Sequence, residues 1–306
     1  MSFQQTLLHP AVPMTLFEVV PPAAGRSEAM EASLHELAQL RGRVDAINIP
    51  EIHDEDRPGE RTSKFIERVE PRELGSRIQR ELGIEAVINR VTVHDAEPER
   101  WFRETCGPWD IRNWVLVGGE SAKIRYPGPA PGAAARLLKG LQLPVSLGAI
   151  TIPSRVNEPD RIRNKNAQGI DFFTSQVMFD SNDLVWLIQR LNGVEARIFL
   201  SFAPVTSRRD LQFLRWLGVD IPGDLDRFLL GAAASDAGPC ENCLDRSINL
   251  AQRILMDVFD NLPPDPPPIG LNIEHITRKN FAPSLTMLDR LGNLYAGLVR
   301  KNFGSY

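Results

Sequence analysis

The stretch MTLFEVVPP, residues 14–22, is the first of several apolar segments from which the fold can be predicted. Its first seven residues form a nearly continuous apolar run rich in β-branched side chains, and two prolines follow the run. Such a run is typical of a short strand that is covered on both faces, as in a parallel sheet. Similar runs follow along the chain, at Val44–Pro50, Glu85–Val91, Asn113–Gly118, Pro144–Ile152, Ile170–Val177, Ala196–Ala203 and Ile269–His275.

Apolar residues at helical spacing fill the gaps between these runs. Ser27–Leu40 begins at a capping-type serine and places Met30, Leu34 and Leu37 on one face. Similar patterns occur at Glu70–Leu82, Pro131–Leu141, Glu158–Gln168, Ser181–Leu191, Cys243–Phe259 and Pro283–Val299. Strands that alternate with helices predict an α/β fold, and the presence of eight strands favours a single (β/α)8 TIM barrel. An open Rossmann sheet is the alternative, although no GxGxxG follows the first strand.

We expect one catalytic domain over residues 1–306, because α/β barrels often use about 250 residues as a single domain. An extended insertion is expected around residues 218–242. The proline-rich stretch 263–268 is expected to lead the chain into the last strand, since such segments are extended and stiff.

The net charge of the chain is −4, so no basic field favours nucleic acid or an anionic membrane surface. No apolar run approaches the ~18 residues of a membrane-spanning helix. The first residues lack the basic segment and long apolar stretch of a signal peptide. We therefore expect a cytoplasmic protein that binds neither nucleic acid nor membrane, and a homo-oligomer is left open.

Cys106, Cys240 and Cys243 are the only cysteines, too few for a disulfide framework. Cys240 and Cys243 form a lone CxxC, and a zinc site would need two more ligands for which no motif is present. We expect no metal site. We interpret the pair as incidental thiols, with a redox pair as the alternative.

Polar residues end most of the predicted strands. The active site of a barrel enzyme lies at the C-terminal ends of its strands, so these residues are predicted to converge on one face. They are Glu18, Glu51, Arg90, Glu120, Arg155, Gln176, Glu274 and His275.

Glu18 is the sharpest candidate for chemistry. It ends an apolar strand, and Pro21 and Pro22 make the exit from that strand stiff, so its carboxyl group should be partly desolvated. Burial raises the pKa of a carboxyl group toward the range in which it donates a proton near neutral pH. A structural glutamate bonded to loop amides explains the same position equally well.

Two further residues are candidates for substrate contacts. Gly118 and Gly119 allow a close backbone approach beside Glu120, whose carboxylate would stabilise positive charge on a substrate. Its alternative role is to satisfy amides after a tight turn. Gln176 would pair with the donor and acceptor edge of a heterocycle, and a buried structural amide is the alternative.

Arg161 and Lys165 lie one helical turn apart, on one face of a predicted helix. They would hold the phosphates of a dinucleotide. A solvated helix face is the commoner meaning of such a charged run.

Together these segments resemble the methylenetetrahydrofolate reductase family, over roughly residues 17–278. The most specific parts are FEVVPP at 17–22 and the run GIDFFTSQ at 169–176, with Lys165 before it and Phe179 and Asp180 after it. The resemblance also rests on the order of the strand-end residues between these parts.

The resemblance implies a (β/α)8 enzyme that reduces 5,10-methylenetetrahydrofolate to 5-methyltetrahydrofolate with NAD(P)H. Glu18 matches the family's catalytic proton donor, and Glu120 falls where the family has an aspartate near the pterin. Gln176 matches the glutamine that contacts the pterin. Lys165 and Arg161 match positions that contact the flavin phosphate and ribose in flavin-containing members.

The remaining strand-end residues complete this expected site. Substrate binding is assigned to Glu51, Arg278 and Gln176. Cofactor binding is assigned to Arg90, Arg155, Arg161, Lys165, Gly118 and Gly119. A pterin-binding methyltransferase or demethylase component, or a non-catalytic folate-binding barrel, would be the alternative function.

The chain departs from flavin-dependent relatives at four customary flavin contacts. It has Pro50-Glu51 where they have Thr-Tyr, Arg90 where they have His, GGE at 118–120 where they have Arg-Gly-Asp, and Ile152 where they have Tyr. Several segments look closer to the flavin-independent branch, in which NADH delivers hydride directly to the folate. NADH is therefore the favoured cofactor, and FAD is left open.

Overall fold

Eight parallel strands close into a barrel in the computed structural model of the protein, with each strand paired to its neighbours in chain order and β8 paired to β1. The structure describes residues 2–54, 64–119, 124–231, 240 and 242–304. The strands are β1 (Thr15–Val19), β2 (Ala46–Ile49), β3 (Glu85–Val91), β4 (Asn113–Val117), β5 (Ser146–Thr151), β6 (Phe172–Ser175), β7 (Arg197–Phe202) and β8 (Ile269–His275). The prediction of a (β/α)8 TIM barrel is confirmed.

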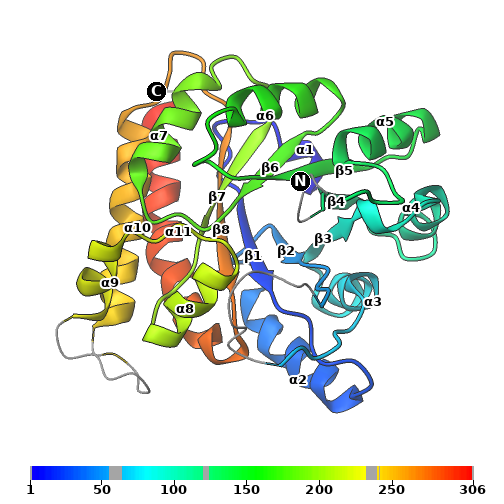
Figure 1. Ribbon diagram of the computed structural model, residues 1–306, viewed down its shortest axis with the longest axis horizontal. Helices are drawn as coiled ribbons and strands as arrows, with labels where there is room; N and C mark the ends of the chain where they lie inside the picture. The colour runs from blue at the N-terminus through cyan, green and yellow to red at the C-terminus, as the bar shows by residue number, and fades with distance from the viewer. Residues whose placement is uncertain (1, 55–63, 120–123, 232–239, 241, 305–306) are drawn as a thin grey trace.

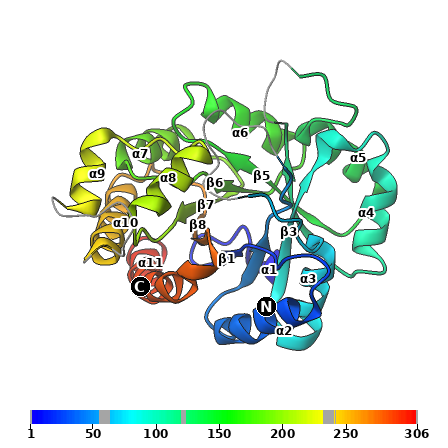
Figure 2. The ribbon, with the colours of Figure 1, turned by 60° about the horizontal axis from the view of Figure 1, so that its bottom comes forward.

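Helices surround the barrel on its outside (Figures 1 and 2). The α-helices are α1 (Phe3–Thr6), α2 (Ser27–Leu37), α3 (Pro71–Arg77), α4 (Pro98–Cys106), α5 (Pro131–Leu141), α6 (Glu158–Ala167), α7 (Ser181–Arg190), α8 (Arg208–Trp216), α9 (Gly223–Leu230), α10 (Cys243–Asp260) and α11 (Phe281–Phe303). Short 3-10 or π turns are η1 (Ala38–Leu40), η2 (Ile78–Leu82), η3 (Thr92–His94) and η4 (Arg278–Asn280). No helix in the described part of the chain is long and apolar enough to span a membrane.

Side chains alternate between the inside and the outside of the barrel along each strand. On β6, Phe172 fills the barrel interior, whereas its neighbour Phe173 belongs to the larger core between the strands and the helices. A Cβ at Gly270 of β8 would lie 2.3 Å from the ring of Phe199, so glycine is needed there to make room for that ring. The interior is a packed core rather than a channel, as in other barrels of this type.

The short helix α1 covers the end of the barrel at which the strands begin. Its Phe3 ring packs against Phe172 and Phe199, with ring centroids 5.7 and 6.3 Å apart. The guanidinium group of Arg197, wholly buried at the start of β7, donates to the carbonyl oxygens of Thr6, Leu7, His9, Val12 and Ile269. This end is therefore sealed, and the opposite end is left for a site.

The insertion expected around residues 218–242 is not extended throughout, because its Gly223–Leu230 part forms α9, which packs beside α10 (Figure 1). Leu229 and Leu230 of α9 are buried in a second apolar cluster that also holds Leu211 and Leu214 of α8. The sequence patterns also missed α1, α4 and α8. The proline-rich stretch 263–268 leads directly into β8, as predicted.

Cys240 and Cys243 are joined by a disulfide, so the interpretation as two incidental thiols is wrong. Asn242 adopts a left-handed conformation, with φ of 64°, just before α10 begins. This turn brings the two Cα atoms to 5.4 Å, a normal separation for a disulfide. Cys106 is buried and unpaired.

Candidate active site

Glu18 and Glu274 lie side by side at the open end of the barrel. Glu18 of β1 is the register partner of Glu274 on β8 and of Asn48 on β2. Leu16, two residues before Glu18, faces the barrel interior, so alternation along the strand places Glu18 on the same side. Both carboxyl groups are recessed but partly accessible.

The surroundings of Glu18 favour its neutral form. Burial raises the pKa of Glu18 from 4.5 to about 7, against the opposing effect of a hydrogen bond from Asn48. That bond runs from Asn48 Nδ2 to Glu18 Oε2 over 2.6 Å. The side chain is thus held in one orientation and is able to give up a proton near neutral pH.

Glu274 is bound through a short polar chain. Asn272 Nδ2 donates to Ser201 Oγ over 2.9 Å, and the Ser201 hydroxyl bonds to Glu274. Burial, and then the neighbouring charge of Glu18, raise the pKa of Glu274 well above its ordinary value, and the Ser201 bond opposes them. His275, the next residue, faces the other way, since its ring packs 5.6 Å from that of Phe281.

Glu51 and Arg90, predicted to contact substrate and cofactor, contact each other. Arg90 donates to Glu51 over 2.7 Å and to Asp95 over 2.9 Å, and the amide of Val91 donates to Glu51 over 2.6 Å. Burial opposes ionisation of Glu51, but bonds from His53 and Val91 and the Arg90 charge outweigh it and lower its pKa. The guanidinium group of Arg90 also lies 4.9 Å from the centre of the Trp101 ring in the outer core, so Arg90 faces the outside of the barrel and not the two carboxyl groups.

Gly118 and Gly119 follow β4, and the close approach they permit is made by the protein itself. A Cβ at Gly119 would lie 2.3 Å from the Tyr126 ring. Gly118 has looser surroundings, with Pro131 3.6 Å from such an atom. Glu120, predicted to be the second catalytic carboxylate, lies outside the described residues.

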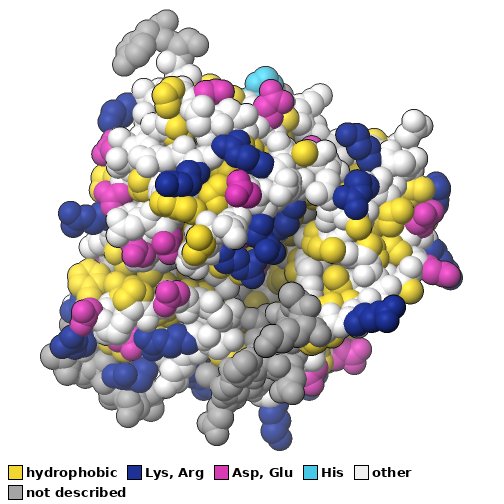
Figure 3. All heavy atoms as spheres, turned by 45° about the horizontal axis from the view of Figure 1, so that its top comes forward, with side chains coloured by type: hydrophobic (Ala, Val, Ile, Leu, Met, Phe, Trp, Pro, Cys, Tyr) yellow, Lys and Arg dark blue, Asp and Glu magenta, His cyan; other side chains and the backbone are white. Residues whose placement is uncertain are grey.

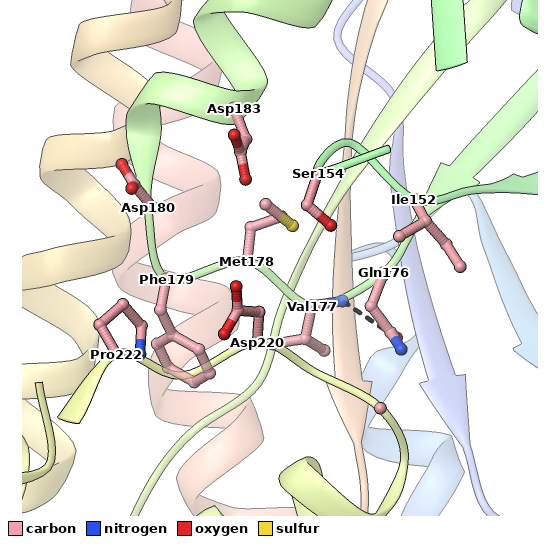
Figure 4. A pocket seen from close by; sticks show the side chains of 11 residues that line it. Ile152, Ser154, Gln176, Val177, Met178, Phe179, Asp180, Asp183, Asp220 and Pro222 are labelled. Atoms are coloured by element: carbon pink, nitrogen blue, oxygen red, sulfur yellow. Dashed lines mark hydrogen bonds between the residues drawn. The ribbon is translucent and has the colours of Figure 1, made fainter. Parts of the chain in front are cut away.

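Gln176 lies at the end of β6, beside a small pocket (Figure 4). Its Nε2 donates to the carbonyl of Leu217 over 3.2 Å, and its Oε1 accepts from the amide of Val177. In this arrangement the amide group is turned to the protein. A bound heterocycle would have to exchange for these partners.

The pocket next to Gln176 is acidic and narrow. Asp180, Asp183 and Asp220 border it, and Asp183 has a raised pKa because of burial and then the two neighbouring carboxylates (Figure 4). Its volume of about 40 Å³ holds a few water molecules and is too small for a pterin. Among the described residues, no group of His, Cys, Asp or Glu side chains has the arrangement of a metal site.

The basic residues predicted to bind a cofactor differ in availability. Lys165 donates to the carbonyl of Ile150 over 3.0 Å, and its ammonium group lies 5.9 Å from the centre of the Phe173 ring, on the outer side of the barrel wall. Arg161 pairs with the buried Glu158 at 3.4 Å. Arg155 is exposed after β5.

Arg278 begins η4, directly after β8, and its side chain is outside the described part of the structure. Acidic and basic side chains are interspersed over the face in Figure 3, and several basic ones gather near its centre.

Sequence reasoning placed Glu18 at the strand end but did not single out its partners. Asn48, Ser201 and Asn272 lie within apolar strands and were taken as part of those runs. These partners could have been found from the alternation of side chains along a strand. Each is a polar residue two positions from an apolar residue or glycine that faces the barrel interior, so it faces the interior as well.

Searches of protein-family models and of curated proteins found no match to this chain. The fold matches 415 chains of known structure, so it does not by itself select a function. One of them is described as an uncharacterized protein from Clostridium thermocellum that binds two copies of 5-methyl-5,6,7,8-tetrahydrofolic acid. It aligns with a TM-score of 0.73 and 19% identity, over 95% of this chain and 99% of that one, which shows a shared fold.

Proposed function

We propose that the protein reduces 5,10-methylenetetrahydrofolate to 5-methyltetrahydrofolate, with Glu18 as the proton donor. The observation that carries the proposal is a carboxyl group with a pKa of about 7 at the open end of the barrel, oriented by Asn48. The resemblance of FEVVPP at 17–22 to the reductase family supports it. A folate ligand in a structural neighbour of the same fold is also in keeping with it.

In this reaction Glu18 protonates N10 of the folate, the bond from N10 to the bridging methylene carbon breaks, and an iminium forms at N5. Hydride addition to the methylene carbon then gives the methyl group, so one proton and one hydride are consumed. NADH, when bound, would supply the hydride. The roles of Gln176 at the pterin, and of Glu120 beside the cationic iminium, remain predictions.

The residues present fit a flavin poorly. Lys165, the best match to a flavin-phosphate contact, is bonded to the Ile150 carbonyl on the outer side of the barrel. Arg90 is held by Glu51 and Asp95, and Tyr126 packs over Gly119. These contacts support direct transfer from NADH, and we derive no step through FAD.

The test is oxidation of NADH that depends on methylenetetrahydrofolate, followed with the purified protein under anaerobic conditions. Glu18→Gln should keep the fold and lower turnover by about 10²–10⁴-fold, the usual contribution of a positioned acid. Glu195→Gln, an exposed change just before β7 at the sealed end, is the matched control and should retain activity. Near-normal turnover in Glu18→Gln would remove that residue from the mechanism.

A folate-binding barrel without turnover is the second candidate. It is favoured by the structural neighbour, whose description gives a bound methylated folate and no reaction. Tight binding of 5-methyltetrahydrofolate, measured by calorimetry, together with no turnover of NADH or NADPH, would select it over the reductase.

A further inference from the structure

We propose that Glu18 and Glu274 form a coupled carboxyl pair, in which the charge of Glu18 keeps the proton on Glu274 after Glu18 has given up its own. The pair itself rests on the geometry of the barrel. Its use in turnover rests on the proposed function.

The barrel forces the two carboxyl groups together. Glu18 and Glu274 are direct register partners on β1 and β8, which pair along all five residues of β1. Neighbouring strands lie about 4.8 Å apart, and partners in a parallel register project to the same side. Two carboxylates at such a separation repel each other, so the pair retains a proton that an isolated carboxyl group would lose.

No described cation relieves this repulsion. The neighbouring strands present Asn48 from β2 and Ser201 from β7, both uncharged. Arg90 of β3 pairs with Glu51 and lies against Trp101 in the outer core, away from the two carboxyl groups. Within the part of the chain that the structure describes, no lysine or arginine forms an ion pair with Glu18 or Glu274.

The surrounding amides also favour a proton in the pair. Asn48 Oδ1 and Asn272 Oδ1 are buried acceptors without a hydrogen-bond partner among the described residues. An ionised carboxylate only accepts hydrogen bonds, whereas a protonated one also donates. A neutral carboxyl group therefore adds a donor to surroundings that have acceptors to spare. The raised pKa of each carboxyl group agrees with this geometry.

Glu18 acts on Glu274 in this arrangement. Once Glu18 carries a charge, ionisation of Glu274 would place a second charge beside it. The last proton is therefore held on Glu274 to a higher pH than that group would hold it alone. Replacing Glu18 by a neutral isostere removes this effect and lets Glu274 ionise at lower pH.

The experiment is a pH titration of the ligand-free protein labelled with ¹³C at the glutamate side-chain carboxyl carbons. The signals of the pair are identified by their loss in Glu18→Gln and Glu274→Gln. In the wild type both should titrate far above an ordinary glutamate. In Glu18→Gln the midpoint of Glu274 should fall by at least one pH unit, whereas in Glu274→Gln that of Glu18 should stay near 7, because burial raises its pKa.

An unchanged midpoint of Glu274 in Glu18→Gln, shown to be folded by circular dichroism, would overturn the pair. Glu195→Gln is the matched control and should shift neither signal. Because the titration needs no substrate, it tests the pair even if the reductase proposal fails.

Discussion

Replacing Glu18 by glutamine should make the folded protein more stable at pH 8 and change its stability little at pH 5. Glutamine keeps an oxygen that accepts from Asn48 Nδ2 but cannot ionise. The pKa of Glu18 is about 7 in the folded protein and 4.5 as an ordinary glutamate. Because the folded value is the higher one, the unfolded chain loses this proton first as the pH rises. The wild type therefore loses stability from about pH 4.5 to 7, and the full cost is present above pH 7.

The size of the effect follows from the difference between the two pKa values. At ~1.36 kcal/mol per pH unit, the rise from 4.5 to about 7 corresponds to about 3 kcal/mol. Most of this cost, about 2.5 kcal/mol, develops between pH 5 and pH 8. Glu18→Gln removes it, so the variant should gain that amount on the wild type over this range.

The assay is urea unfolding of both proteins at pH 5 and pH 8, followed by tryptophan fluorescence. Glu51→Gln is the control with the opposite sign, because the pKa of Glu51 is lowered by its partners and its ionised form is the stabilising one. It should lose stability at pH 8. If the gain of Glu18→Gln over the wild type is no larger at pH 8 than at pH 5, the reasoning about burial at this position is refuted.

Three further substitutions test the sealed end of the barrel, the packing of its interior and the expected cofactor contacts. Arg197→Met should destabilise the protein by about 3–5 kcal/mol in urea unfolding, because it leaves the carbonyl groups at the sealed end without a donor. The control Arg215→Met loses only a half-exposed ion pair and should cost less than about 1 kcal/mol. Gly270→Ala should lower stability by about 1–3 kcal/mol in the same assay through overpacking of the barrel interior, and an unchanged midpoint would contradict the tight fit. Lys165→Met should leave the KM for NADH within about twofold of the wild-type value, because the ammonium group of Lys165 is bonded on the outer side of the barrel wall. Arg155→Gln, at an exposed residue, should raise that KM. A KM raised by Lys165→Met and unchanged by Arg155→Gln would show that the phosphates bind at Lys165.

The apolar pattern of the chain is enough to predict the barrel. Eight apolar runs separated by helical patterns leave few other arrangements, because a parallel strand must be covered on both faces and each crossover needs a helix. It also placed Glu18 at a strand end, since a polar residue that closes an apolar run marks the point where the chain leaves the core. Strand boundaries were overestimated by one to two residues at several ends, where apolar residues continue past the last ladder bond.

Which polar groups face each other could not be predicted from the sequence, because it depends on how the strands pair around the barrel. Glu18 and Glu274 are far apart in the sequence and become neighbours because β8 closes the barrel onto β1. The pairing of β2 with β3 likewise brings Glu51 to Arg90, and the position of α6 outside the barrel lets Lys165 reach the carbonyl of Ile150 from the outer side. The pKa of a carboxyl group depends on its burial and on charges a few ångströms away, and local sequence carries neither quantity. The sequence thus located an acid, and the folded barrel supplied the burial that raises its pKa and the second carboxyl group beside it.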